Sequence, residues 1–259
     1  MTKIQILNPA KCDALTLVFQ NMKLFSGDVN VSFAPTAMEI QALDAGHVSI
    51  VALFIPASWF DVYETDGVVI GINTGILSKI LGTREKSQTI QIDLGTSNDL
   101  LISFVSADTS VFNKTFDVPL IDLDAEAMTI PDVEYQAEFS LASANFASLM
   151  NQLKMFGETM ELHCCESKIE LFSRSLDCGR MSVEIRIDDL TAFSIEEGAE
   201  LKLSFSLAYL YNMAQFHKLA KEVELKFKEG YPLQVVYYLA GDTTATLRLY
   251  LAPKIEDSE

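Results

Sequence analysis

The residues that most often carry catalysis or metal binding are few in this chain and lie apart. The three histidines, His47, His163 and His217, occupy three different local contexts. The one tempting cluster is His163 beside Cys164 and Cys165. Neighbouring side chains on a strand point to opposite faces, so at most His163 and Cys165 could cooperate. We interpret all of them as ordinary strand residues.

Short motifs that organise common active sites are also absent from the sequence. We find no G-x-x-x-x-G-K-[ST] loop, G-x-G-x-x-G turn, H-E-x-x-H helix or G-x-S-x-G elbow. The four cysteines match neither a disulfide framework nor a C-x-x-C metal spacing. The sequence therefore predicts no catalytic residue, no metal site and no cofactor. The thiols are expected to be reduced and mostly buried, as in an intracellular protein.

Two amphipathic segments share the same apolar spacing, and we expect them to be helices that position any functional residues. The first has the spacing of one helix face, with apolar residues at Leu15, Val18, Phe19, Met22 and Phe25. The second repeats that spacing 131 positions later, at Phe146, Leu149, Met150, Leu153 and Phe156. A glycine that can end a helix follows each segment, at Gly27 and Gly157. The chain is therefore predicted to contain two copies of one unit.

A second helical segment is predicted in each copy, at residues 74–82 and 206–220. Short alternating strand patterns surround the helices, at residues 29–33, 90–94, 133–141, 181–187, 201–205, 223–227 and 245–251. Many short antiparallel strands with two helices per copy predict an α+β fold, in which each sheet packs one face against the helices.

The boundary between the copies is predicted within residues 116–134, which hold two prolines and six acidic residues. Such a composition is typical of a solvated connector. We therefore expect an N-terminal domain at residues 1–117, a connecting loop at 118–133 and a C-terminal domain at 134–259.

Charge separates two interpretations of the helices. The formal net charge is −17, with 19 Lys plus Arg against 36 Asp plus Glu, which disfavours nucleic-acid binding by overall charge. Salt screens exposed charges over about 8 Å, so a local row of cations could still face phosphate. Basic residues lie on or beside all four predicted helices, at Lys11, Lys23, Lys79, Arg84, Lys154, His217, Lys218 and Lys221. They form either a solvated helix face or a surface for one common partner.

The start of the chain, MTKIQILNPAKCD, contains no apolar leader segment. No stretch approaches the roughly 18 apolar residues that a membrane span requires. We therefore expect a soluble, unsecreted protein.

The segment LRLYLAPKIEDSE at 247–259 closely resembles the end of the proliferating cell nuclear antigen family, the DNA sliding clamps of eukaryotic and archaeal replication. Three further blocks are similar in the same order: LDAGHVSIV (43–51) with FDVY (60–63), GINTGILSKIL (71–81) and DLDAEAMTIPDVEY (122–135). The resemblance covers essentially the full chain and agrees with the repeat, because this family joins two similar domains by a loop. It implies a homotrimeric ring whose strands form the outer layer and whose helices line a hole around duplex DNA.

The resemblance further implies a pocket for the PIP box, a partner motif of one glutamine followed by spaced aliphatic and paired aromatic residues. Its lining would be Leu43, His47, Val48, Ile50, Met128, Ile130, Pro232, Tyr250, Ala252, Pro253 and Ile255. The basic residues of the helices would face DNA without reading its sequence. This chain departs from the family at Thr16 and Leu17, where the first helix is usually basic.

The partners implied by the resemblance are DNA polymerase, the clamp loader, flap endonuclease, DNA ligase and other PIP-box proteins, in the nucleus. Subunit contacts are expected on edge strands at residues 110–118 and 179–187. At the position where the family commonly carries a modifiable lysine, this chain has Glu166, with Lys168 nearby. The resemblance therefore does not extend to ubiquitin-type control through that site.

Three other readings stay open from the residues themselves. A checkpoint-type or heterotrimeric clamp subunit would share the fold and repeat but need different neighbours. A hydrolase using one cysteine, or an acidic protein that mimics DNA, would belong to a different functional class.

Overall fold

The computed structural model describes residues 2–95, 99–124 and 130–255. The elements of the first half are β1 (Thr2–Ile6), α1 (Pro9–Met22), β2 (Asp28–Ala34), β3 (Ala37–Leu43), β4 (Ser49–Pro56), the 3₁₀-helix η1 (Ala57–Trp59), β5 (Val62–Glu64), β6 (Val68–Asn73), α2 (Thr74–Gly82), β7 (Thr89–Leu94), β8 (Leu100–Val105), β9 (Lys114–Val118) and β10 (Leu120–Ile121). Those of the second half are β11 (Ala137–Ala142), α3 (Ser143–Leu153), β12 (Thr159–Cys165), β13 (Lys168–Ser175), β14 (Gly179–Ile185), η2 (Ile187–Asp189), β15 (Ala192–Ile195), β16 (Leu201–Ser206), α4 (Leu207–Ala214), η3 (Gln215–Lys218), β17 (Glu222–Phe227), β18 (Leu233–Leu239) and β19 (Asp242–Leu251).

The order and pairing of these elements confirm the predicted α+β fold and its repeat. In the first half β1 lies between β5 and β7, and in the second half β11 lies between β15 and β17. Likewise β2 lies between β3 and β6, as β12 lies between β13 and β16. All of these pairs are antiparallel, so the two halves share one topology.

Contacts divide the chain into two compact units that exchange short segments. The first unit comprises residues 1–45, 51–129 and 238–247, and the second comprises 46–50, 130–237 and 248–259. The first unit has one sheet in the order β5-β1-β7-β8-β9 and another in the order β10-β6-β2-β3-β4, which residues 242–247 of β19 extend next to β4. The second unit has the sheets β14-β13-β12-β16 and β18-β17-β11-β15.

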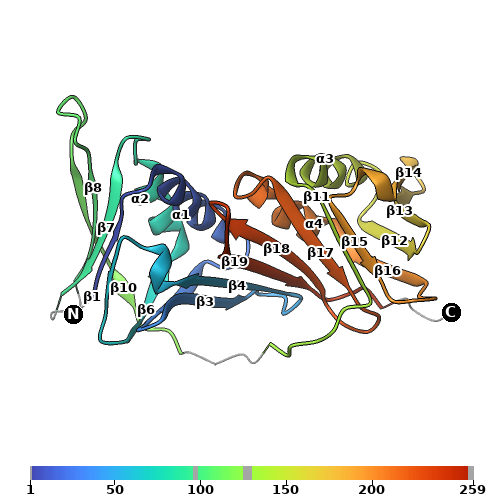
Figure 1. Cartoon of the computed structure of the whole chain (residues 1–259), viewed down its shortest axis with the longest axis horizontal. Coiled ribbons are helices and arrows are strands. Elements are labelled where there is room, and N and C mark those ends of the chain that lie inside the picture. The colour runs from blue at the N-terminus through green and yellow to red at the C-terminus, as the bar shows by residue number, and fades with distance from the viewer. Residues whose placement is uncertain (1, 96–98, 125–129, 256–259) are drawn as a thin grey trace. The chain divides into compact units, whose positions relative to one another are not determined.

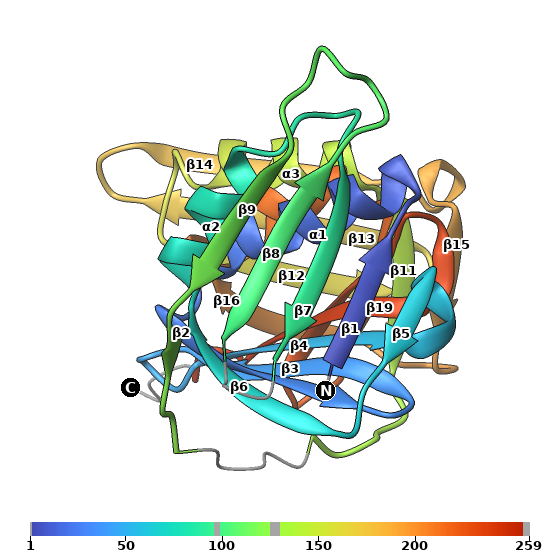
Figure 2. The same cartoon turned by 90° about the vertical axis from the view of Figure 1, so that its left-hand side faces the viewer.

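Each unit packs its two helices together over its strands. Figure 2 looks onto the five strands β5, β1, β7, β8 and β9 of the first unit, with α1 and α2 behind them. In the second unit α3 packs against α4, β11 and β17 (Figure 1). None of the helices in the described ranges is long and apolar enough to cross a membrane.

Local sequence explains where the first two helices begin. The Asn8 side chain accepts hydrogen bonds from Ala10 N and Lys11 N, and Pro9 occupies the first turn of α1. Asn73 Oδ1 accepts the N–H of Ile76 at 3.0 Å and begins α2 in the same way. The predicted apolar face of α1 is fully used, because Leu15, Val18, Phe19 and Met22 are buried.

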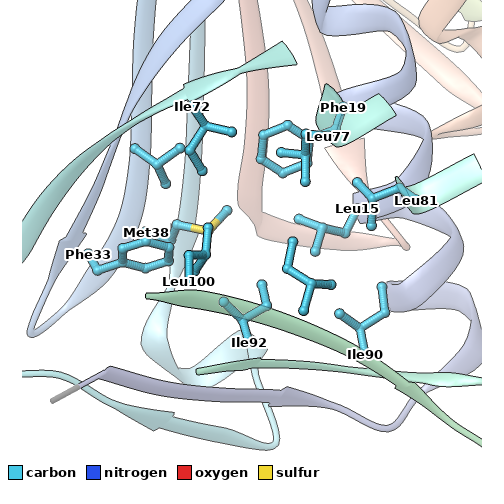
Figure 3. Close-up of a pocket in the computed structure, with 12 residues that line it drawn as sticks. Leu15, Phe19, Phe33, Met38, Ile72, Leu77, Leu81, Ile90, Ile92 and Leu100 are labelled. Carbon is cyan, nitrogen blue, oxygen red and sulfur yellow. The ribbon is translucent and has the colours of Figure 1, made fainter. Parts of the chain in front are cut away.

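The core of the first unit contains a small apolar cavity of ≈ 20 Å³ (Figure 3). Leu15 and Phe19 reach it from α1, and Leu77 and Leu81 reach it from α2. The second unit has a matching cavity of ≈ 10 Å³, lined by Phe146, Met150 and neighbouring apolar residues. Since both cavities are wholly apolar and this small, we interpret them as packing voids rather than ligand sites.

Three sequence predictions were wrong in detail. Residues 133–136 alternate but precede β11, which begins at Ala137. The helix predicted at 206–220 is α4 followed by the 3₁₀-helix η3, which ends at Lys218. The strand predicted at 181–187 is β14, which begins at Gly179 and ends at Ile185, and Ile187 begins the 3₁₀-helix η2.

Candidate functional site

The loop between β3 and β4 presents part of the expected pocket lining. His47 is exposed and adopts a left-handed backbone with φ 55°, a conformation uncommon outside glycine and the short polar residues. This turn brings Val48 back toward the C-terminal strand, where its carbonyl oxygen accepts the N–H of Ala252 at 3.0 Å. Val48 and Ile50 are both half-buried. The backbone of Val48 therefore lies next to the tail.

The tail after β19 is anchored to the second unit at two points. Lys254 N donates to the carbonyl oxygen of Ser204 at 2.7 Å, and Lys254 Nζ donates to Thr159 Oγ1 at 2.6 Å. Ala252 and Pro253 are half-buried, whereas Ile255 is 92% exposed. The anchored backbone thus leaves the side chain of Ile255 in solvent, next in the chain to the anchored Lys254.

Tyr250, another residue of the expected lining, is buried rather than exposed at the surface. Its ring is buried, and its Oη accepts a hydrogen bond of 2.7 Å from Gln234 Nε2. Nearby, burial raises the pKa of Tyr135 to about 12, and the charges of Tyr250 and Glu138 add to the rise. Tyr250 therefore contributes through packing, and its hydroxyl is held by the hydrogen bond from Gln234.

The remaining residues of the expected lining differ in exposure. Pro232 is exposed, and Ile130 is half-buried in the second unit. Leu43 ends β3 in the first unit and is half-buried. Met128 lies outside the described residues. The structure thus brings Val48 together with Ala252.

In the first unit, the basic residues of the helices fall into two groups. Lys23 and Lys79 are exposed at the end of α1 and on α2. Lys11 instead donates to the carbonyl oxygen of Trp59 and lies over its ring. The guanidinium of Arg84, whose side chain is only 4% exposed, pairs with Asp13. The expectation that Arg84 faces DNA therefore conflicts with its burial and its internal ion pair.

The basic residues of the second unit likewise fall into an exposed group and a group engaged within the chain. Lys154, Lys218 and Lys221 are exposed. His217 is half-buried, with Nδ1 3.0 Å from the carbonyl oxygen of Ala214. Lys154 Nζ on the α3 side lies 4.2 Å from the ring centroid of Tyr211 on α4, a cation–π contact that restrains the ammonium.

Sequence reasoning missed the role of Tyr211. The only signal was its place on α4, six residues before His217, and that spacing does not reveal a partner on another helix.

The cluster of His163, Cys164 and Cys165 does not form a catalytic or metal-binding arrangement. His163 packs edge-on against Phe172 with ring centroids 4.9 Å apart. Burial raises the pKa of the Cys164 thiol to about 11, with a smaller contribution from the neighbouring Cys165. Across the described part of the chain, no group of three His, Cys, Asp or Glu residues could hold a metal ion.

A duplicated fold with paired helices and exposed cations on those helices agrees with the resemblance to the DNA sliding clamps. Family models agree over nearly the whole chain: the proliferating cell nuclear antigen N-terminal domain matches residues 9–128, and the C-terminal domain matches residues 129–254. The chain therefore belongs to the proliferating cell nuclear antigen family. The proliferating cell nuclear antigen of Chaetomium thermophilum is 29% identical over 239 residues, which cover 90% of this chain and 91% of that protein.

Membership of this family identifies the protein as a DNA sliding clamp and polymerase processivity factor in DNA replication and repair. The family is a non-enzymatic scaffold, which confirms the prediction that the chain has no catalytic function.

Proposed function

We propose that three copies of this chain close into a ring around duplex DNA and that the ring docks PIP-box proteins beside its C-terminal tail. The observation that carries the trimer is a pair of unmatched strand edges. In the repeat, β14 corresponds to β4, and β9 corresponds to β19. Within the chain β4 has β19 as its neighbour, whereas β14 and β9 end their sheets. Pairing β9 of one copy with β14 of the next would repeat the internal arrangement and leave neither edge open.

The domain limits of this proposal are residues 1–117 and 134–259, joined by the connecting loop at 118–133. The repeat of strand pairings supports this division. Residues 110–118 and 179–187, which include β9 and β14, would then form the subunit contacts.

The DNA-facing surface of the ring would consist of the exposed cations on the four helices, namely Lys23, Lys79, Lys154, Lys218 and Lys221. Lys11, Arg84 and His217 would have a supporting role, because each is engaged inside the chain. Lysines that contact phosphates without reading bases allow sliding.

The docking surface would take a short helical turn whose apolar side chains cover Val48, Ala252, Pro253 and Ile255. Burying each apolar anchor contributes roughly 1.5 to 3 kcal/mol, enough for an affinity that still permits exchange. By family, the expected partners are DNA polymerase, the clamp loader, flap endonuclease and DNA ligase, in the nucleus.

Glu166 gives the proposed ring one departure from its family. Its Oε1 accepts the N–H of Gly198 at 2.9 Å, so the side chain has a local structural use. Lys168 pairs with Glu170 at 2.7 Å. We do not propose modification at either position.

A threading experiment tests the proposal without a clamp loader. Linear duplex is tethered to a bead at one end, incubated with a high concentration of the protein and then blocked at its free end. We expect the protein to survive a high-salt wash and to be released when a nuclease cuts the duplex. Loss during the wash despite the block, or retention after the cut, would contradict encirclement.

A further inference from the structure

The second unit contains an open groove that the proposed docking surface and helix face do not use. It has a volume of ≈ 710 Å³ and is lined by three segments, residues 134–136, 194–196 and 228–230. These segments are the approach to β11, the end of β15 and the turn between β17 and β18. The groove therefore follows one rim of the sheet formed by β18, β17, β11 and β15.

Gln136 joins the three segments and fixes the shape of the groove. Its backbone oxygen accepts the N–H of Glu196 at 2.8 Å, and its Oε1 accepts the N–H of Glu229 at 2.9 Å. Its own N–H donates to the carbonyl oxygen of Phe227 at 2.9 Å. A ligand would thus meet a wall that is already formed.

One side of the groove is the open edge of β15. Among the described strands, this one ends its sheet and pairs with β11 alone. The N–H groups of an antiparallel strand point alternately to its two sides. Because the N–H of Glu196 points at Gln136, those of Phe193 and Ile195 point away from β11. The outer edge can therefore accept another extended chain.

The lining has a distinct charge. Glu134, Glu196 and Glu229 contribute three carboxylates, and none of them makes an ion pair within the described part of the chain. The one cation, Lys228, has its Nζ 4.8 Å from the ring centroid of Tyr231. A basic ligand is therefore favoured over an acidic one, and this charge excludes nucleic acid as the occupant.

We propose that this groove binds an extended, lysine- or arginine-rich segment of a protein partner, which adds as a strand to the outer edge of β15. Backbone hydrogen bonds would come from β15, and basic side chains would meet the three glutamates. The aliphatic parts of these side chains could cover Tyr135 and Ile195. This mode differs from the helical turn expected at the tail, so the two sites could be occupied together.

The probe is a fluorescent, end-capped peptide of alternating lysine and threonine, titrated against the full chain at low salt and followed by anisotropy. Replacing all three glutamates (Glu134→Gln, Glu196→Gln and Glu229→Gln) should weaken binding about tenfold, because exposed ion pairs are individually weak. A matched control removes three exposed carboxylates elsewhere: Glu39→Gln, Glu64→Gln and Glu158→Gln. The control should bind as tightly as the parent protein.

Backbone pairing is tested separately with the same peptide N-methylated at its central residues. The methylated peptide keeps every charge but loses its central backbone N–H donors. We expect it to bind about tenfold more weakly because these hydrogen bonds are lost. Equal affinity of the methylated peptide, or equal loss in both glutamine triples, would overturn the proposal. An unlabelled PIP-box peptide should not displace the probe, and displacement would mean that the probe occupies the tail surface instead.

Discussion

Single side-chain contacts decide which cations of the proposed DNA-facing surface are exposed. Lys79 lies exposed on α2, whereas Arg84, five residues later, is held by Asp13 and Thr16. The ion pair of Arg84 joins residues 71 positions apart, so no local pattern in the sequence could reveal it. Position on a helix therefore did not reveal which of the basic residues are exposed.

Replacing Lys79 with glutamine should weaken duplex DNA binding and reduce its salt dependence. Each lost phosphate contact lowers the slope of log affinity against log salt by about 0.9. The control is Lys202→Gln, because Lys202 is exposed on β16 rather than on a helix. Equal slopes for the two variants, measured by titration of a short duplex, would count against a DNA-facing role for α2.

Ile255 gives the sharpest test of the docking surface, because the side chain is almost fully exposed and its removal should not affect folding. We expect Ile255→Ser to weaken a PIP-box peptide about tenfold, the loss of one buried anchor. Met155→Ser, at another exposed apolar residue, should leave the affinity unchanged. An unaltered affinity for Ile255→Ser in isothermal titration would exclude Ile255 from the lining.

At the scale of elements, the start of the connector is held by a close approach that only glycine permits. Ile121 pairs with Gly71 across β10 and β6. A Cβ at Gly71 would meet the backbone oxygen of Ile121 at 2.3 Å and Leu123 Cγ at 3.1 Å. Since a backbone oxygen cannot rotate away, the pairing of β10 depends on this glycine.

Gly71→Ala should therefore release β10 from β6 and destabilise the protein by about 1 to 3 kcal/mol, the usual cost of overpacking. Hydrogen exchange should show faster exchange at Leu120 and Ile121, and thermal unfolding should show the loss of stability. Gly82→Ala is the matched control, because its Cβ would meet only Gln20 at an ordinary 3.7 Å. Unchanged protection of β10 in Gly71→Ala would refute this role.

The proposed subunit edges carry exposed apolar residues that a ring would cover. Phe112, just before β9, is 82% exposed, and Leu176, between β13 and β14, is fully exposed. The double variant Phe112→Ser with Leu176→Ser should shift the assembly toward monomer at low micromolar concentration. Val69→Ser, at an exposed residue of β6, should remain assembled. Sedimentation velocity distinguishes these outcomes, and an intact double variant would contradict contacts at these edges.

The sequence predicted elements well where local signals agree. Residues 74–82 form α2 as expected, because Asn73 caps its first turn and an apolar face is buried. It predicted poorly where pairing is non-local. The three residues of β5 and the two of β10 are too short for a period, and they are strands only because β1 and β6 lie beside them. Apolar and polar residues alternate at 133–136, but this alternation does not show whether a neighbouring strand is present to pair with them.

The candidate functional site shows the same contrast between local and non-local signals. The tail segment and the β3–β4 loop were identified by their resemblance, since exposure and hydrogen bonding cannot be read from one sequence. The hydroxyl of Tyr250 bonded to Gln234 and the ring of Tyr211 near Lys154 are tertiary facts. The groove around Gln136 likewise joins three segments that are far apart in the chain.

For the whole molecule, charge and assembly have to be considered together. One chain carries −17, so a ring of three would carry three times that charge. Such a particle is repelled by DNA at long range, and a few helix lysines cannot hold it tightly on their own. Retention must therefore come from encirclement, which requires the ring to close.

Native mass at low micromolar concentration tests that requirement most directly. The subunit mass is 28.7 kDa, so light scattering on a sized sample should give 86.1 kDa, three times the subunit mass, if three copies close through β9 and β14. A stable species at 28.7 kDa would contradict an autonomous ring and would mean that this chain needs a different partner to encircle DNA.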